Sequence, residues 1–130
     1  MIDKKTILIV DDDPDYMFQI GLQVESFGFN VIKAEGRKKG EEILKKTKPD
    51  LCIFDLMMET QDSGFILAYK CKQMYPDVPV IIATAVTTET GMVFKVETDE
   101  DKSWIKADKL LEKGIRKDQL EREINILLKI

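Results

Sequence analysis

The sequence predicts an α/β protein built on a doubly wound, five-stranded parallel sheet. Short apolar runs, which are typical of strands buried on both faces, alternate along the chain with segments of helical periodicity. Each strand–helix–strand unit needs a crossover, and right-handed crossovers place helices on both faces of the sheet. The 130 residues suit one domain, and no repeat or Gly/Ser linker divides residues 1–130.

The predicted elements follow one another in order. The first strand, Thr6–Val10, is a continuous apolar run, and Asp13 with Pro14 caps the helix that follows. Apolar residues spaced three and four apart give that helix one inner face, and Gly28 ends it. The remaining predictions are strands at Phe29–Ala34, Leu51–Phe54, Val78–Ala83 and around Leu110-Leu111, and helices at Gly36–Lys48, Ser63–Tyr75 and Lys117–Ile130.

The segment Val86–Lys106 breaks this alternation. It is rich in threonine and acidic residues and poor in helical periodicity. We predict an irregular segment with at most one short helical turn, standing where a fourth helix is otherwise expected. Loops of that length are uncommon in compact domains and are often functional.

The composition excludes several classes of protein. With 20 Lys+Arg against 24 Asp+Glu the net charge is −4, which argues against a nucleic-acid-binding domain. Histidine is absent, so Ser/His or Cys/His catalysis and His-containing zinc sites are excluded. The first apolar run is too short for a signal peptide or a membrane span. Cys52 and Cys71 do not suggest a disulfide scaffold, and Cys52 is expected to be buried. We expect a cytoplasmic protein.

Polar residues stand directly after four of the five predicted strands. Asp11, Asp12 and Asp13 follow the first strand, Asp55 the third, Thr84 the fourth and Lys113 the fifth. Sites in open parallel sheets form at the carboxyl ends of the strands, so we expect these side chains to share one edge. Taken singly, Asp11, Asp12, Thr84 and Lys113 are better explained as helix caps, turn residues or solvated charges, and for Asp13 capping is the preferred interpretation.

Taken together, these residues suit phosphoryl transfer. Clustered carboxylates repel one another unless a cation joins them, and a site of oxygen ligands suits Mg²⁺. An Asp carboxylate such as Asp55 can act as a nucleophile and form an aspartyl phosphate. The Lys113 ammonium and the Thr84 hydroxyl would then contact the phosphoryl oxygens.

Four segments resemble, in order, the motifs of the receiver domain of two-component response regulators. They are ILIVDDDPD at Ile7–Asp15, PDLCIFDLMM at Pro49–Met58, VPVIIATA at Val78–Ala85 and ADKLLEKGI at Ala107–Ile115. The resemblance covers essentially the whole chain and implies a flavodoxin-like topology. It also implies that Asp55 accepts a phosphoryl group from a partner sensor histidine kinase or histidine phosphotransfer protein.

The same resemblance implies roles for the other site residues. Asp12 would ligate Mg²⁺ directly, Asp11 would act largely through water, and the backbone carbonyl of Met57 would complete the protein ligands. Thr84 and Lys113 would follow the phosphoryl group and relay its arrival to the surface.

Four features depart from the family pattern. Gly114 follows the lysine where the family usually has proline, and Leu110 stands at the aromatic switch position. Glu59 replaces a proline after the phosphoacceptor strand. Val86–Lys106 replaces the regular fourth helix of the family's common output face, so we expect an atypical choice of partner.

Met57 and Val86 occupy positions that influence dephosphorylation in the family. Both are apolar here and offer no group to orient an attacking water molecule. We therefore expect a long-lived phosphoryl group.

We predict a stand-alone phosphoacceptor rather than an enzyme that turns over an external substrate. No residues follow Ile130, so output is expected through a downstream protein partner, with no nucleic acid and no membrane, from a monomer or a phosphorylation-dependent dimer.

Three alternatives stay open at this point. The chain could be a receiver-like scaffold that is never phosphorylated, which the departures at Gly114 and Leu110 would suit. An aspartyl-phosphate phosphohydrolase of the haloacid dehalogenase type is disfavoured, because Met57 stands where such enzymes have a second Asp. A flavodoxin-like nucleotide or flavin carrier is disfavoured because the acidic first loop would repel phosphate.

Overall fold

A computed structural model describes residues 4–56, 58, 63–84 and 107–130. Five parallel strands form one sheet in the order β2-β1-β3-β4-β5. The strands are β1 (Thr6–Asp11), β2 (Asn30–Glu35), β3 (Leu51–Asp55), β4 (Val80–Thr84) and β5 (Lys109–Glu112). The helices of the described residues are α1 (Pro14–Ser26), α2 (Arg37–Lys46), α3 (Ser63–Met74) and α5 (Lys117–Leu128).

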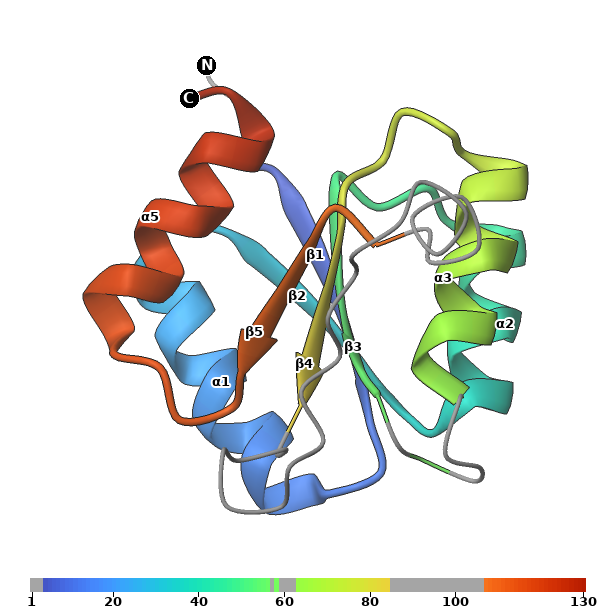
Figure 1. The fold of residues 1–130 in the computed structure, drawn as a ribbon, viewed down its shortest axis with the longest axis horizontal. Helices are drawn as coiled ribbons and strands as arrows, with labels where there is room; N and C mark the ends of the chain where they lie inside the picture. The colour runs from blue at the N-terminus through green and yellow to red at the C-terminus, as the bar shows by residue number, and fades with distance from the viewer. Residues whose placement is uncertain (1–3, 57, 59–62, 85–106) are drawn as a thin grey trace, which may run out of the picture.

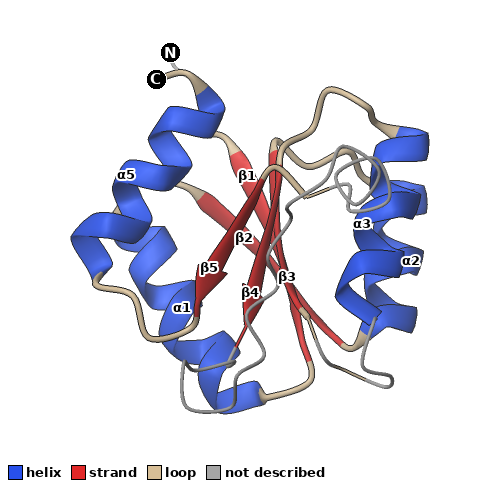
Figure 2. Cartoon of the chain, in the orientation of Figure 1, coloured by secondary structure: helices blue, strands red, loops and turns tan. Residues whose placement is uncertain are grey.

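The helices cover both faces of the sheet, which confirms the predicted doubly wound architecture. Helices α1 and α5 lie on one face, and α2 and α3 lie on the other (Figures 1 and 2). No helix in the described part of the chain is both long enough and apolar enough to cross a membrane.

Alternation along the strands builds a separate core on each face. On β1, Leu8 and Val10 belong to the core under α2 and α3, whereas Ile7 and Ile9 belong to the core under α1 and α5. All four side chains are at most 1% exposed, as expected for a strand covered on both faces. The two cores therefore pack the sheet between its helices from both sides.

The two cysteines lie inside the core, as expected for Cys52. Cys52 and Cys71 are both fully buried and free, with their Sγ atoms 3.8 Å apart. They act here as small apolar side chains between β3 and α3.

Helix α1 begins and ends as the sequence predicts. The Asp13 side chain caps it, because Oδ1 accepts hydrogen bonds from the backbone N–H groups of Asp15 at 3.0 Å and Tyr16 at 3.4 Å. At the other end Gly28 has φ 98°, a conformation that favours glycine. These two residues set where α1 stands relative to the end of β1.

Several predicted boundaries were wrong by one or two residues. The helix predicted at Gly36–Lys48 spans only Arg37–Lys46, since Gly36 has φ 89° and Thr47 is extended. The last helix ends at Leu128, because Lys129 is left-handed. The strand predicted at Val78–Ala83 begins at Val80 instead.

The segment at 86–106, predicted to replace much of the fourth helix, lies outside the described residues. Positions 57 and 59, occupied by Met57 and Glu59, lie outside them too.

Candidate functional site

The register of the sheet brings the predicted polar residues to one edge. Val10 on β1 pairs with Phe54 on β3, so Asp11 and Asp55 occupy the next position on each strand. Asp55 pairs with Ala83 on β4, and Thr84 follows it. The backbone carbonyl of Thr84 accepts a hydrogen bond from the backbone N–H of Lys113, at 2.9 Å. The carboxyl edge of the sheet therefore gathers residues that lie about 100 positions apart in the chain.

Three carboxylates form a compact cluster at this edge. Asp11, Asp12 and Asp55 each offer one oxygen, and these three oxygens lie within 4.8 Å of one another. Asp11 and Asp55 are 1% and 6% exposed, whereas Asp12 is exposed. Two buried acids beside an open one form a cluster that is closed on the protein side and accessible from solvent.

The Asp11 carboxylate is oriented by the loop that leads into α1. Its Oδ1 accepts a hydrogen bond from the backbone N–H of Asp13, at 2.9 Å. Its Oδ2 is buried and, among the described residues, has no partner other than the Lys113 ammonium. An oriented, buried oxygen with spare lone pairs suits a cation. An all-oxygen donor set, partly open to water, matches the preference of Mg²⁺.

Lys113 is the cation that balances this cluster in the described part of the chain. Its Nζ lies 2.9 Å from Asp11 Oδ2 and 3.1 Å from Asp55 Oδ1. Burial alone would lower the pKa of Lys113, but its hydrogen bonds and charge attraction to Asp11 and Asp55 outweigh this and raise the pKa. The ammonium is therefore fully charged at neutral pH and bridges two strand ends.

The surroundings of Asp55 disfavour the ionised form of its carboxyl group. Burial raises the pKa of Asp55 to about 6, and the nearby charge of Asp11 adds to the rise while Lys113 opposes it. One ammonium does not neutralise three carboxylates. The site consequently gains stability from any added positive charge, which is the property expected of a metal site.

Gly64, at the start of α3, makes a close approach that the sequence did not indicate. A Cβ at this position would lie 2.5 Å from the Asp55 carbonyl oxygen and 2.7 Å from Leu56 Cα. The Gly64 N–H also donates to the Leu56 carbonyl, at 2.8 Å. The absence of a side chain lets α3 pack directly against the backbone that carries Asp55.

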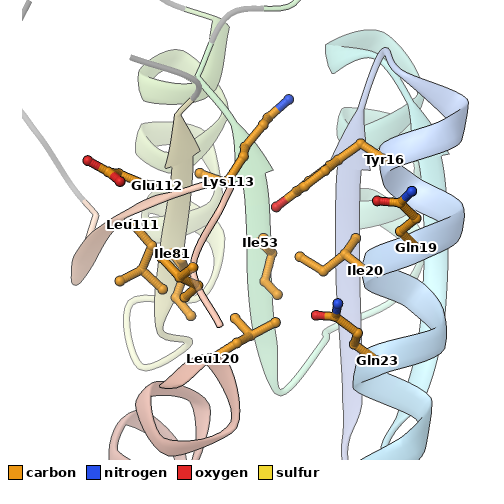
Figure 3. Close-up of a pocket in the computed structure, with 12 residues that line it drawn as sticks. Tyr16, Gln19, Ile20, Gln23, Ile53, Ile81, Leu111, Glu112, Lys113 and Leu120 are labelled. Atoms are coloured by element: carbon orange, nitrogen blue, oxygen red, sulfur yellow. The ribbon is translucent and has the colours of Figure 1, made fainter. Parts of the chain in front are cut away.

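Tyr16 is a further residue of the site that the sequence reasoning missed. The ring centroid lies 4.5 Å from Lys113 Nζ, within the range of a cation–π contact. Figure 3 shows Tyr16 extending from α1 toward the strands, while Lys113 extends from the end of β5. Both side chains line a pocket of about 50 Å³ between α1 and β5. Tyr16 is four residues before Ile20, a buried residue of α1. This helical spacing was the signal in the sequence that could have placed Tyr16 on the inner face of the helix.

The predicted site residues thus fall into three groups. Asp11, Asp12, Asp55 and Lys113 lie together, and Thr84 adjoins them on β4. Asp13 caps the N-terminus of α1, which confirms the preferred interpretation of this residue. Residue 57 lies outside the described part of the chain.

Comparison with known proteins defines the class. A family model described as the response regulator receiver domain matches residues 7–125. The chain belongs to this family, whose members are the phosphoacceptor modules of two-component signalling systems.

Relatives of known sequence agree with this assignment. The chain is 32% identical over 130 residues to protein PilH of Pseudomonas aeruginosa, covering 94% of this chain and 96% of that protein. It is 40% identical over 79 residues to the transcriptional regulatory protein GlrR of Escherichia coli, covering 61% of this chain but only 18% of that protein. The match to PilH therefore runs through a whole protein, and the match to GlrR through one part of a larger one.

Solved structures share the fold. A CheY-like response regulator receiver domain protein from Methanospirillum hungatei superimposes with a TM-score of 0.80 at 22% identity, covering 98% of this chain and 95% of that one. The response regulator TrrA from Thermotoga maritima, in complex with Mg²⁺-BeF, superimposes with a TM-score of 0.76 at 22% identity, covering 95% of this chain and 98% of that one.

Proposed function

We propose that this receiver domain accepts a phosphoryl group on Asp55, with Mg²⁺ held by Asp11, Asp12 and Asp55. The observation that carries the proposal is the arrangement around Asp55. A buried carboxylate at a strand end lies beside two further carboxylates and within 3.1 Å of the Lys113 ammonium. The Mg²⁺-BeF complex of TrrA supports it, since that protein has the same fold.

The residues around Asp55 can supply what the transfer needs. A carboxylate oxygen of Asp55 forms the new bond to phosphorus, and the bond from phosphorus to the donor nitrogen breaks, with its electron pair leaving on that nitrogen. The metal supplies positive charge for the phosphoryl oxygens. Lys113 contacts a phosphoryl oxygen, and the Thr84 hydroxyl contacts another. The backbone carbonyl of Met57 is proposed to complete the protein ligands of the metal.

We propose that the donor is a phosphohistidine presented by a partner histidine kinase or phosphotransfer protein. Residues 1–130 contain no histidine of their own that could supply it. Output then passes to a downstream protein that binds the phosphorylated form. The chain turns over no external substrate in this scheme, and we class it as a non-enzyme.

The direct experiment is phosphorylation of the purified chain by acetyl phosphate with Mg²⁺. Intact-mass spectrometry is expected to show one phosphoryl group, stable in acid and labile in base. Asp55→Asn should abolish the adduct, and omission of Mg²⁺ should suppress it.

Asp77→Asn serves as the matched control, because Asp77 is an exposed aspartate paired with Lys48 at 3.0 Å, far from the sheet edge. It should leave the adduct unchanged. Absence of an adduct on the wild type would support the scaffold alternative, and an undiminished adduct on Asp55→Asn would place the acceptor elsewhere.

A further inference from the structure

Tyr16 stands where it can control the one ammonium that the described residues place in the acidic cluster. Capping by Asp13 fixes the first turn of α1, and side chains in that turn lean toward the helix N-terminus. Here this direction leads to the edge of the sheet where Asp11 and Asp55 lie. The Tyr16 ring consequently faces Lys113, with its centroid 4.5 Å from Nζ.

Among the described residues, the position that follows Lys113 has open space beside it. Gly114 follows, and a Cβ there would meet nothing within 4 Å. The backbone N–H of Lys113 is tied to Thr84, but the side chain reaches beyond that bond. The contacts described for the ammonium are Asp11, Asp55 and the face of Tyr16.

The ring is suited to this contact over the whole working pH range. Burial raises the pKa of Tyr16 well above its ordinary value, and the charges of Asp11 and Asp55 add to the rise. The hydroxyl therefore stays neutral. A neutral aromatic face attracts an ammonium without adding a further negative charge to the site, in contrast to a carboxylate.

We propose that Tyr16 is a positioning residue that holds the Lys113 ammonium against Asp11 and Asp55. Tyr16 thereby sets how readily the ammonium moves from Asp11 to an incoming phosphoryl oxygen. The proposal rests on the proposed function for its second part. An ammonium held on Asp11 Oδ2 also competes with a metal ion for that oxygen. The ring thus favours correct placement of Lys113 in the reaction at the expense of metal affinity.

Tyr16→Leu removes the aromatic face, and Tyr16→Phe keeps it. In Tyr16→Leu we expect Mg²⁺ to bind more tightly, by about 2- to 10-fold, because the ammonium is held less firmly on Asp11. Phosphorylation by acetyl phosphate at saturating Mg²⁺ should slow by roughly 2- to 30-fold, the range corresponding to one cation–π contact. Tyr16→Phe should restore both quantities most of the way to wild type.

The opposite signs separate positioning from simple damage to α1, which would weaken metal binding and phosphorylation together. Calorimetric titration gives the Mg²⁺ affinity. Proton NMR of the metal-free protein gives the ring-current shift of the Lys113 ε-methylene group, expected in wild type and Tyr16→Phe and lost in Tyr16→Leu. Tyr69→Leu, at an exposed tyrosine of α3, is the matched control and should change none of these.

The outcomes distinguish this inference from the proposed function. If the wild type takes no phosphoryl group, the proposed function fails, while the Mg²⁺ titration and the ring-current shift still show whether the ring holds the ammonium. The inference is overturned if Tyr16→Leu binds Mg²⁺ no more tightly than wild type, if Tyr16→Phe behaves as Tyr16→Leu does, or if the Lys113 shift is the same in all variants.

Discussion

Replacing Asp55 with asparagine should stabilise the metal-free protein above neutral pH. The pKa of Asp55 is raised from its ordinary 3.8 to about 6, first by burial and then by the charge of Asp11. Each factor of ten in proton affinity corresponds to about 1.4 kcal/mol, so ionising Asp55 costs the folded state about 3 kcal/mol. Asparagine resembles the neutral acid in shape and avoids this cost.

The sign of the pH dependence follows from proton uptake. Between the ordinary pKa of 3.8 and the raised pKa of about 6, folded Asp55 keeps its proton while unfolded Asp55 has lost it. The contribution of this residue to stability is therefore greatest at low pH and is lost as the pH rises through about 6. The free energy of unfolding of Asp55→Asn should exceed that of wild type by about 3 kcal/mol at pH 8 and should match it near pH 4.

Urea unfolding followed by circular dichroism, in EDTA, measures both free energies across this pH range. Glu42→Gln, at an exposed acid of α2, is the control and should show no such trend. The reasoning is refuted if Asp55→Asn is no more stable than wild type at pH 8, or if the difference does not change with pH. Adding Mg²⁺ should reduce the difference in free energy of unfolding between Asp55→Asn and wild type, because the metal favours the ionised carboxylate.

Three further predictions concern the same edge of the sheet. Mg²⁺ at about 100 times its dissociation constant should stabilise wild type by about 2.7 kcal/mol in thermal or urea unfolding. Asp12→Ala should lose most of this stabilisation. If Mg²⁺ stabilises Asp12→Ala as much as wild type, Asp12 is not part of the site. Gly64→Ala places a methyl group 2.5 Å from the Asp55 carbonyl oxygen and should destabilise by about 1–3 kcal/mol, whereas unchanged stability would show that α3 can shift freely. With apolar Met57 and Val86, the phosphoryl group on Asp55 should decay over minutes or longer once the donor is removed; intact-mass time courses that show decay in seconds would contradict this.

Sequence reasoning was most successful where one local property determines the structure. Apolar runs such as Thr6–Val10 predicted buried strands, and Asp13 with Pro14 predicted the start of α1. The polar residues at the strand ends then came together because parallel strands share a carboxyl edge. The meeting of Asp11 with Asp55 needed only these regularities, whereas the topology of the sheet was implied by the resemblance to the receiver family.

The same reasoning could not place the side chains that act across the sheet. The Lys113 ammonium bridges Asp11 and Asp55 through a rotamer that no pattern in the chain encodes. Tyr16 joins the site because its side chain reaches from the first turn of α1 to Lys113 at the end of β5, and Gly64 does so because α3 packs against β3. Each depends on how two elements meet in space, whereas sequence spacing reports on one element at a time.

Gly28 and Gly114 separate two effects of adding a side chain, namely backbone strain and a lack of space. A Cβ at Gly28 or at Gly114 would meet nothing within 4 Å, but only Gly28 has a positive φ, of 98°. Alanine should therefore destabilise at Gly28 by about 1 kcal/mol through backbone strain alone.

At Gly114 alanine should stabilise by about 0.4–1 kcal/mol, because it restricts the unfolded chain and fits the folded one. Urea midpoints of the two variants, measured with unchanged m-values, provide the comparison. Gly114 also lies next to Lys113, where the receiver pattern usually has the more rigid proline. If Gly114→Ala raises stability and leaves the Lys113 ε-methylene shift in place, the backbone freedom of glycine is not needed to keep the ammonium beside the Tyr16 ring. Loss of stability would instead mean that the lysine loop visits a conformation open only to glycine.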